Sequence, residues 1–374
     1  MRILPGEYAE RVEALRGLVR RAELDVFIVS SFDSIHYLCG AGFEPLERPF
    51  FLLIRGEGEP VLLVPKLDQR HMEKAHNIAA ENIRTYWEYP APAGRNWADR
   101  LREEIGSGGE IGIEPTLRQE VVQELGGLTV RVEPLVEQLR LIKSPGEIAM
   151  IRRASWYADF GVERLLAASC FGAKVATGFA ETRTVTSRII RELDDFDPLT
   201  TKVIMATWAA PRSSEPHSIP DLGDELREGA HVALVLTRAN GYAAESERTY
   251  FTSTPSSEER GAFAAMLESR RLAFGMIRPG VPCAEIDGAV NEFLEREGYG
   301  GDENRLHRTG HGIGLGNHEA PWIAVGSEDR LKENMVISVE PGIYLPGLGG
   351  FRHSDTVLVT GDGCELLTRL PTDL

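Results

Sequence analysis

Two histidines flank a glycine-rich tract in the last fifth of the chain. His311 lies within Gly310–Gly316, and His318 follows it seven residues later. Glycine has no Cβ, so the backbone of this tract can approach a ligand closely. Residues seven apart in a strand project from opposite faces, so a shared ligand requires a turn between the histidines, which the glycines permit. The pattern favours a binding site over a flexible turn with incidental histidines.

Three carboxylates offer complementary chemistry. Glu340 follows the apolar run 335–339, a position at the end of a strand that suits a functional side chain. Glu245, Glu247 and Thr249 alternate, which predicts one shared strand face. Two carboxylates side by side repel each other unless a cation, a proton or an arginine intervenes, and a cationic substrate group could serve. A solvated face of an antiparallel sheet remains the alternative.

His217 and Arg48 lie in loops. Pro216 and Pro220 hold the chain around His217 extended, and an imidazole with a pKa near 6.5 can move protons. An ordinary surface histidine is the alternative. Arg48 precedes Pro49 without a local pattern that distinguishes it from a surface arginine.

The length of 374 residues predicts two domains. Residues 1–138 alternate between helical and strand patterns, which indicates an α/β domain. Its predicted elements are a helix over 8–22, strands at 25–30 and 110–114, and a hairpin of 50–54 with 60–64.

Residues 139–374 show paired helices followed by strands. Ser144 can cap a helix whose first residue is Pro145. The order of elements hints at an internal duplication and predicts an α+β domain with paired helices over one face of a curved sheet. The predicted helices are 145–170, 181–193, 257–277 and 284–297, and the predicted strands are 202–206, 231–236, 335–339 and 356–359.

Net charge excludes some partners. The chain carries a formal charge of −16, which makes nucleic acid and anionic membrane surfaces poor partners. No run of about 18 apolar residues is present, and the first residues have no apolar targeting segment, so we expect a cytoplasmic protein.

The motifs of the second half resemble the pita-bread (M24) hydrolases, which include Xaa-Pro aminopeptidases and dipeptidases, methionine aminopeptidases and creatinase. The first half resembles the smaller domain of creatinase and the prolidases. The resemblance implies a pita-bread domain with a mostly antiparallel curved sheet. The matching segments are 216–217, 241–249, 309–321, 339–344 and 349–352.

The metallopeptidase branch binds two ions through two Asp, one His and two Glu. The resemblance places the His on His311 and one Glu on Glu340, but the other ligands fall on Leu234, Glu245 and Ser354. Leucine cannot bind a metal, and serine is a poor substitute for a bridging carboxylate. We therefore do not expect a two-metal centre.

The metal-free creatinase branch implies a different site. His217 would be the general acid and base, and Glu247 and Glu340 would bind the substrate next to it. Arg48 would reach the substrate carboxylate in the partner subunit of a homodimer. Trp322 stands where creatinase has a second such arginine. The remaining predicted substrate-binding residues are His311, His318, Glu245 and Arg352.

Our main prediction is therefore a creatinase-like hydrolase without a metal or other cofactor, which cleaves a C–N bond of a small carboxylate-bearing guanidino, amidino or N-substituted amino acid. The first alternative is a metal-dependent Xaa-Pro dipeptidase or aminopeptidase P, with one ion such as Mn or Co on Glu245, His311 and Glu340. The second alternative is a non-catalytic binding module on the same fold.

Overall fold

The computed structural model describes residues 2–44 and 46–373. These residues form two compact units, one within residues 3–140 and the other of residues 141–373 together with Arg2. Within the described residues, no helix has both the length and the apolar character needed to cross a bilayer.

The N-terminal unit is built on a mixed six-stranded sheet with the order β4-β3-β2-β1-β5-β6. Two antiparallel pairings, β1 with β2 and β2 with β3, lie between parallel pairings toward both edges. The buried side chains of one sheet face form a core with Trp97 and Leu101 of α4. The elements are α1 (Pro5–Arg21), β1 (Val26–Val29), α2 (Phe32–Cys39), β2 (Phe51–Ile54), β3 (Val61–Pro65), α3 (Gln69–Met72), β4 (Ile83–Tyr86), α4 (Trp97–Ile105), β5 (Glu110–Ile113), α5 (Gln119–Glu124), β6 (Thr129–Val132) and α6 (Leu135–Arg140).

The C-terminal unit contains a ten-stranded sheet with two groups of helices. Its order is β11-β10-β12-β15-β9-β8-β14-β13, with β16 beside β15 and β7 beside β8. All pairings are antiparallel except that of β14 with β8. The helices are α7 (Pro145–Ala167), α8 (Val175–Phe179), α9 (Thr182–Glu192), α10 (Ser257–Met276) and α11 (Cys283–Arg296). The strands are β7 (Lys202–Trp208), β8 (Ala230–Ala239), β9 (Tyr242–Phe251), β10 (Gly310–Gly312), β11 (Glu319–Ile323), β12 (Val336–Val339), β13 (Gly342–Leu345), β14 (Gly349–Arg352), β15 (Ser354–Val359) and β16 (Cys364–Leu366).

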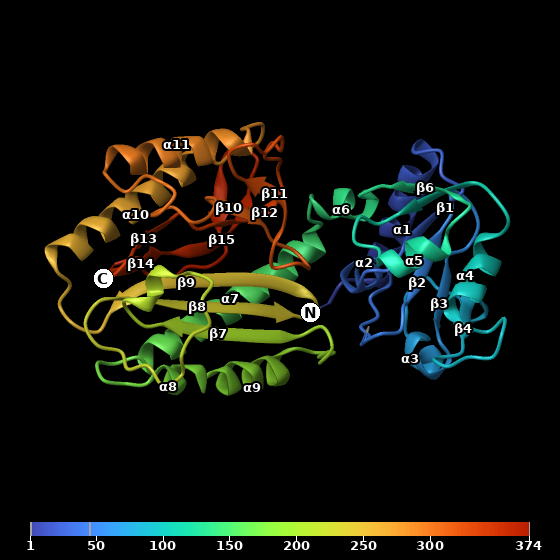
Figure 1. The fold of residues 1–374 in the computed structure, drawn as a ribbon, viewed down its shortest axis with the longest axis horizontal. Helices are drawn as coiled ribbons and strands as arrows, with labels where there is room; N and C mark the ends of the chain where they lie inside the picture. The colour runs from blue at the N-terminus through green and yellow to red at the C-terminus, as the bar shows by residue number, and fades with distance from the viewer. Residues whose placement is uncertain (1, 45, 374) are drawn as a thin grey trace. The chain divides into compact units, whose positions relative to one another are not determined.

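Each helix group covers its own part of the sheet. Helices α7 and α9 pack on β7, β8 and β9 around one hydrophobic core, and α10 and α11 pack on the C-terminal strands around another. Figure 1 shows α10 and α11 together above the red strands, while α7 to α9 lie with the yellow-green ones. This arrangement is the pita-bread architecture, and the predicted fold class is confirmed.

The two long helices begin with the same local structure. Ser144 accepts a hydrogen bond from the Glu147 backbone, and the Glu147 side chain accepts one from the Ser144 backbone. Ser256 and Glu259 repeat this capping box at the start of α10. The box satisfies amide groups that a helix N-terminus otherwise leaves unpaired. Its repetition agrees with the internal duplication suggested by the order of elements.

A buried charge network ties the C-terminal segment to the sheet. Asp355 on β15 pairs with Arg248 and Arg270, and all three side chains are buried. Arg248 also donates hydrogen bonds to the backbone oxygens of Leu370 and Pro371, at 3.0 and 3.1 Å. The residues after β16 are therefore held by side chains of the central strands.

Candidate metal centre and active site

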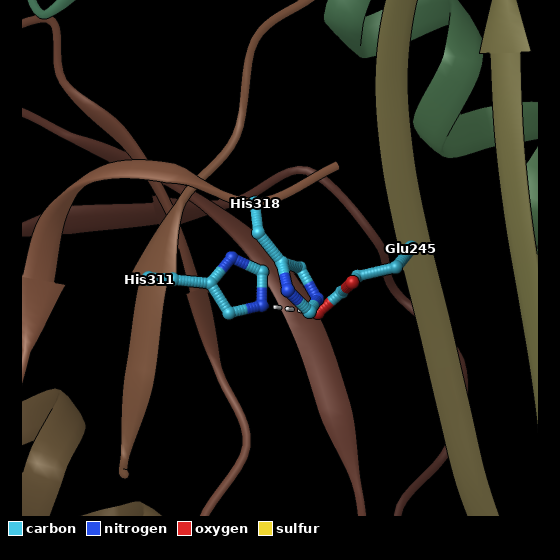
Figure 2. A group of neighbouring side chains, drawn as sticks. All are labelled: Glu245, His311 and His318. Carbon is cyan, nitrogen blue, oxygen red and sulfur yellow. Dashed lines mark ion pairs between the residues drawn. The ribbon is translucent and has the colours of Figure 1, made fainter. Parts of the chain in front are cut away.

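Three side chains from separate elements converge on one point of the C-terminal unit. Glu245 comes from the middle of β9, His311 from the short strand β10, and His318 from the bend that precedes β11. One ligand atom from each lies within 4.8 Å of the others. Figure 2 shows the two imidazoles side by side with the Glu245 carboxylate reaching toward them. The turn that the glycines were predicted to allow does bring the two histidines together, with ring centroids 4.0 Å apart.

His311 has the hydrogen-bonding arrangement of a metal ligand. Its Nδ1 lies 3.0 Å from the Gly312 carbonyl oxygen, a contact in which the ring must donate. The neutral ring then carries its lone pair on Nε2. A hydrogen bond from the other ring nitrogen to a carbonyl oxygen commonly fixes the tautomer of metal-binding histidines in this way. Nε2 is buried, makes no hydrogen bond of standard geometry, and faces Glu340 Oε1 at 3.1 Å and Glu245 Oε1 at 3.7 Å.

The two carboxylates control the charge of this histidine. Burial opposes protonation of His311, but Glu245 and Glu340 outweigh it and raise the pKa of the ring to about 9. Burial raises the pKa of Glu340, yet the contact with His311 brings it well below its usual range. Burial and the neighbouring His311 lower the pKa of His318 to about 4, so His318 is neutral at pH 7. Without a metal, a proton on His311 occupies the position between the carboxylates.

Two serines orient Glu245. The hydroxyls of Ser338 and Ser354 both donate to its Oε1, the latter at 2.7 Å. Ser338 also contacts the Ser354 hydroxyl at 2.9 Å. Burial is the main influence on Glu245 and raises the pKa of its carboxyl, which a nearby cation would oppose.

This donor set suits a divalent cation. Two imidazole nitrogens and a carboxylate oxygen are ligands typical of Zn and related first-row ions, and Glu340 stands next to them. The buried Nε2 of His311 faces two carboxylates without a hydrogen bond of standard geometry, and this observation supports the fit. The predicted ligands Glu245 and His311 belong to the cluster, and His318 joins them. The third predicted ligand, Glu340, contacts the cluster through His311 Nε2.

Close packing explains the glycines of β10. A Cβ on Gly310 would collide with the Ser338 carbonyl oxygen, and a Cβ on Gly312 would collide with the carbonyl of Ala320. Both neighbours are backbone atoms of the flanking strand segments and cannot swing aside. The glycines thus hold His311 tightly between β11 and β12.

Glu247 has a different partner from Glu245. Arg352 Nη2 donates to Glu247 Oε1 at 3.0 Å, and Arg352 Nε contacts Oε2. Arg352 Nη1 donates to the Tyr344 hydroxyl at 3.1 Å. Burial disfavours the charged guanidinium, but Glu247 next to it raises its pKa. Burial raises the pKa of Glu247 to about 8, and the Arg352 guanidinium beside it opposes this rise. The predicted substrate-binding residue Arg352 therefore makes a buried ion pair with a predicted catalytic residue.

The other predicted site residues lie further out. His217 is exposed in a turn, yet it is close enough for its charge to lower the pKa of His318. Trp322 is 38% exposed on β11, with the Arg308 guanidinium 4.5 Å from the ring centroid. Arg48 belongs to the N-terminal unit, where it pairs with Glu88 at 2.8 Å.

Sequence reasoning missed the groups that support the cluster. Ser338 had a visible signal, because a lone hydroxyl within an apolar strand must find a partner when it is buried. Tyr344 was part of a matched motif, but its contact with Arg352 has no local pattern. The buried pair of Lys143 and Glu319 joins residues 176 positions apart, so neither position alone indicated it.

Comparison with known proteins identifies both units. Residues 199–361 match the model of metallopeptidase family M24, and residues 11–142 match the creatinase/prolidase N-terminal domain. The chain is 30% identical to the Xaa-Pro dipeptidase of Lactobacillus helveticus over 385 aligned positions, covering 97% of this chain and 98% of the relative.

Solved structures agree with these matches. The prolidase from Pyrococcus horikoshii OT3 superposes with a TM-score of 0.81 at 26% identity, covering 98% of this chain and 99% of that structure. The dipeptidase PepE from Mycobacterium ulcerans gives a TM-score of 0.84 at 26% identity, covering 100% and 99%.

These findings correct two predictions. The metal-independent, creatinase-like hydrolase is wrong, because the relatives are Xaa-Pro dipeptidases and the second half matches a metallopeptidase family. The absence of a metal cofactor is wrong for the same reason, and because Glu245, His311 and His318 form a ligand cluster. Leu234 and Ser354 argued only against a two-metal centre, and the alternative with one ion on Glu245, His311 and Glu340 stayed open. The chain is a hydrolase, and it belongs to the M24 metallopeptidase family with a creatinase/prolidase N-terminal domain.

Proposed function

We propose that this protein is a metal-dependent dipeptidase that hydrolyses the bond between an N-terminal residue and proline. The observation that carries the proposal is the buried Nε2 of His311, which faces Glu340 at 3.1 Å and Glu245 at 3.7 Å and belongs to one ligand cluster with His318. The similarity to Xaa-Pro dipeptidases along 97% of the chain supports the substrate class.

Glu245, His311 and His318 would hold a divalent cation, with Glu340 beside them. A bound cation of this kind polarises a carbonyl group and lowers the pKa of a bound water.

The protein side chains would bind the cation and accept a proton from the attacking water. His311 must give up its proton before Nε2 can bind a metal, and the Gly312 carbonyl keeps the other proton on Nδ1. Glu340 is ionised at neutral pH, so its oxygens can accept a proton from the attacking water. His318 is neutral at this pH and can serve as a ligand without first losing a proton.

The sheet offers an apolar surface next to these groups. Leu236 lies directly opposite Glu245 in the β8–β9 pairing, and Leu234 lies opposite Glu247. Directly opposed residues project from the same face, and both leucines are only half-buried. A proline ring or an apolar side chain of a dipeptide can pack against this surface, which favours a small apolar substrate.

We also retain the prediction of a homodimer in which Arg48 reaches the carboxylate of a substrate in the partner's site. The pair that Arg48 makes with Glu88 supports this idea, because Glu88 is 49% exposed and a substrate carboxylate could replace it at little cost. Sedimentation of the protein and of Arg48→Met would test it. An active monomer would remove Arg48 from the site.

The test of function uses the purified full chain. Protein treated with EDTA is assayed on Leu-Pro and Met-Pro, with Leu-Ala as a control peptide, before and after addition of Mn²⁺, Co²⁺ or Zn²⁺. We expect loss of Xaa-Pro hydrolysis on chelation, recovery with at least one metal, and little cleavage of Leu-Ala. Full turnover in the chelated protein, or no Xaa-Pro cleavage with any metal, would contradict the proposal.

A further inference from the structure

The two carboxylates on the site face of β9 are not equivalent. Glu245 accepts hydrogen bonds from Ser338 and Ser354 through Oε1 alone. Glu247 uses both oxygens in contacts with the Arg352 guanidinium. The other oxygen of Glu245 is therefore available to a cation. Glu247 already contacts a cation, the Arg352 guanidinium.

The neighbours of Glu247 supply no further anionic ligand. In the sheet register, Glu247 stands opposite Leu234 on one side and opposite Ser354 on the other. Leucine has no donor atom, and the Ser354 hydroxyl is engaged with Glu245. In the parts of the chain that the structure describes, the one ligand group of three or more His, Cys, Asp or Glu is the cluster of Glu245, His311 and His318.

Charge also opposes a second ion at Glu247. The Arg352 guanidinium is buried and held on one side by Glu247 and on the other by the Tyr344 hydroxyl. A divalent cation at Glu247 would have to displace this guanidinium or lie next to it in a poorly solvated site. Like charges in such a site repel strongly because little water screens them.

We propose that the site binds one divalent cation per chain and that Arg352 takes the place of a second by neutralising Glu247. This inference rests on the proposed function, since it assumes a metal at Glu245, His311 and His318. It assigns Arg352 and Glu247 to positioning and charge balance rather than to metal binding.

The decisive measurement is metal stoichiometry in the wild-type protein. Metal-stripped chain is dialysed to equilibrium against Mn²⁺ at concentrations that saturate binding, and bound Mn is determined by elemental analysis and by electron paramagnetic resonance. We expect one Mn²⁺ per chain with the spectrum of an isolated ion. Two ions per chain with a spin-coupled spectrum would overturn this inference and leave the proposed function standing. Binding of no ion would sink the proposed function, and this inference with it.

Two matched variants distinguish the roles of the two carboxylates in metal binding. Glu245→Gln should weaken Mn²⁺ binding at least tenfold, because the cluster loses its anionic ligand. Glu247→Gln should still bind one Mn²⁺ with an affinity within about threefold of wild type, since Glu247 is not a ligand. A loss of Mn²⁺ affinity in Glu247→Gln as large as that in Glu245→Gln would contradict the assignment. Circular dichroism checks that both variants are folded, and the wild-type stoichiometry decides the question if either is not.

Discussion

Lys143 Nζ donates a hydrogen bond to Glu319 Oε1 at 3.0 Å, although 176 residues separate them in sequence. The lysine side chain is 1% exposed and the glutamate side chain 13% exposed. The other oxygen of Glu319 accepts a hydrogen bond from the Gly316 amide. This pair therefore connects the residue just before α7 to the bend that carries His318.

Replacement of Lys143 by methionine should destabilise the protein and weaken metal binding. Breaking a buried ion pair by removing one partner costs about 3–5 kcal/mol, because the other charge stays buried. The bend around Gly316 and His318 would lose its anchor, so Mn²⁺ affinity should fall as well. Urea unfolding and Mn²⁺ titration measure the two effects. The exposed Lys332→Met is the control and should leave both within error; equal behaviour of the two variants would show that the pair has no such role.

The metal-free protein should lose stability as pH rises from neutral to alkaline values. The pKa of His311 in the folded chain is about 9, above its ordinary value near 6.5. Its ion pair stabilises the fold fully below about pH 6.5 and ceases to do so as pH rises through about 9. In EDTA, the stability difference between wild type and His311→Gln should shrink by about 3 kcal/mol from pH 6 to pH 10. Denaturant unfolding at several pH values measures this difference. A constant difference for His311→Gln would disprove the protonated pair.

Alanine at Gly312 should be far more damaging than alanine at Gly288. A Cβ at Gly312 meets the Ala320 backbone, whereas a Cβ at Gly288 in α11 meets open space. Forced overpacking costs about 1–3 kcal/mol, while Gly→Ala within a helix gains about 0.5–1 kcal/mol. Thermal unfolding should thus move in opposite directions for the two variants. Gly312→Ala should also weaken Mn²⁺ binding, since it displaces the strand that carries His311; unchanged metal affinity would count against that view.

Replacement of Leu236 by serine should raise KM for apolar Xaa-Pro dipeptides about tenfold. Loss of one buried aliphatic contact removes roughly 1.5 kcal/mol of binding, which corresponds to that factor. The value of kcat should change little, because the leucine offers no group for chemistry. Steady-state kinetics on Leu-Pro checks this, with the exposed Leu222→Ser as the control. A lowered kcat at constant KM would place Leu236 in a different role.

Local sequence patterns predicted the elements whose signals are local. The helix beginning at Pro145 and capped by Ser144 occurs as α7, and the alternation of Glu245, Glu247 and Thr249 occurs on β9. The strand β10 escaped prediction because Gly-His-Gly has no strand propensity, and its pairing depends on neighbours that pack too closely for a Cβ.

Contacts between residues far apart in sequence limited how much of the site could be predicted. The motif positions identified Glu245, His311 and His318, but their distances depend on how the bend folds back onto β9. Glu247 and Arg352 are 105 residues apart in sequence, and no local residue pattern indicates that they pair. The error about the metal came from preferring a metal-free site once Leu234 and Ser354 had argued against a two-metal centre, although Glu245, His311 and His318 can together hold one ion.

The anchoring of Leu370 and Pro371 by Arg248 matters for anyone who engineers this chain. Truncation before Leu370 would remove two hydrogen-bond acceptors from the buried Arg248 guanidinium, next to Glu247, and would disturb β9. An affinity tag or fusion partner on this side therefore needs a flexible spacer after Pro371, so that Leu370 and Pro371 keep their hydrogen bonds to Arg248.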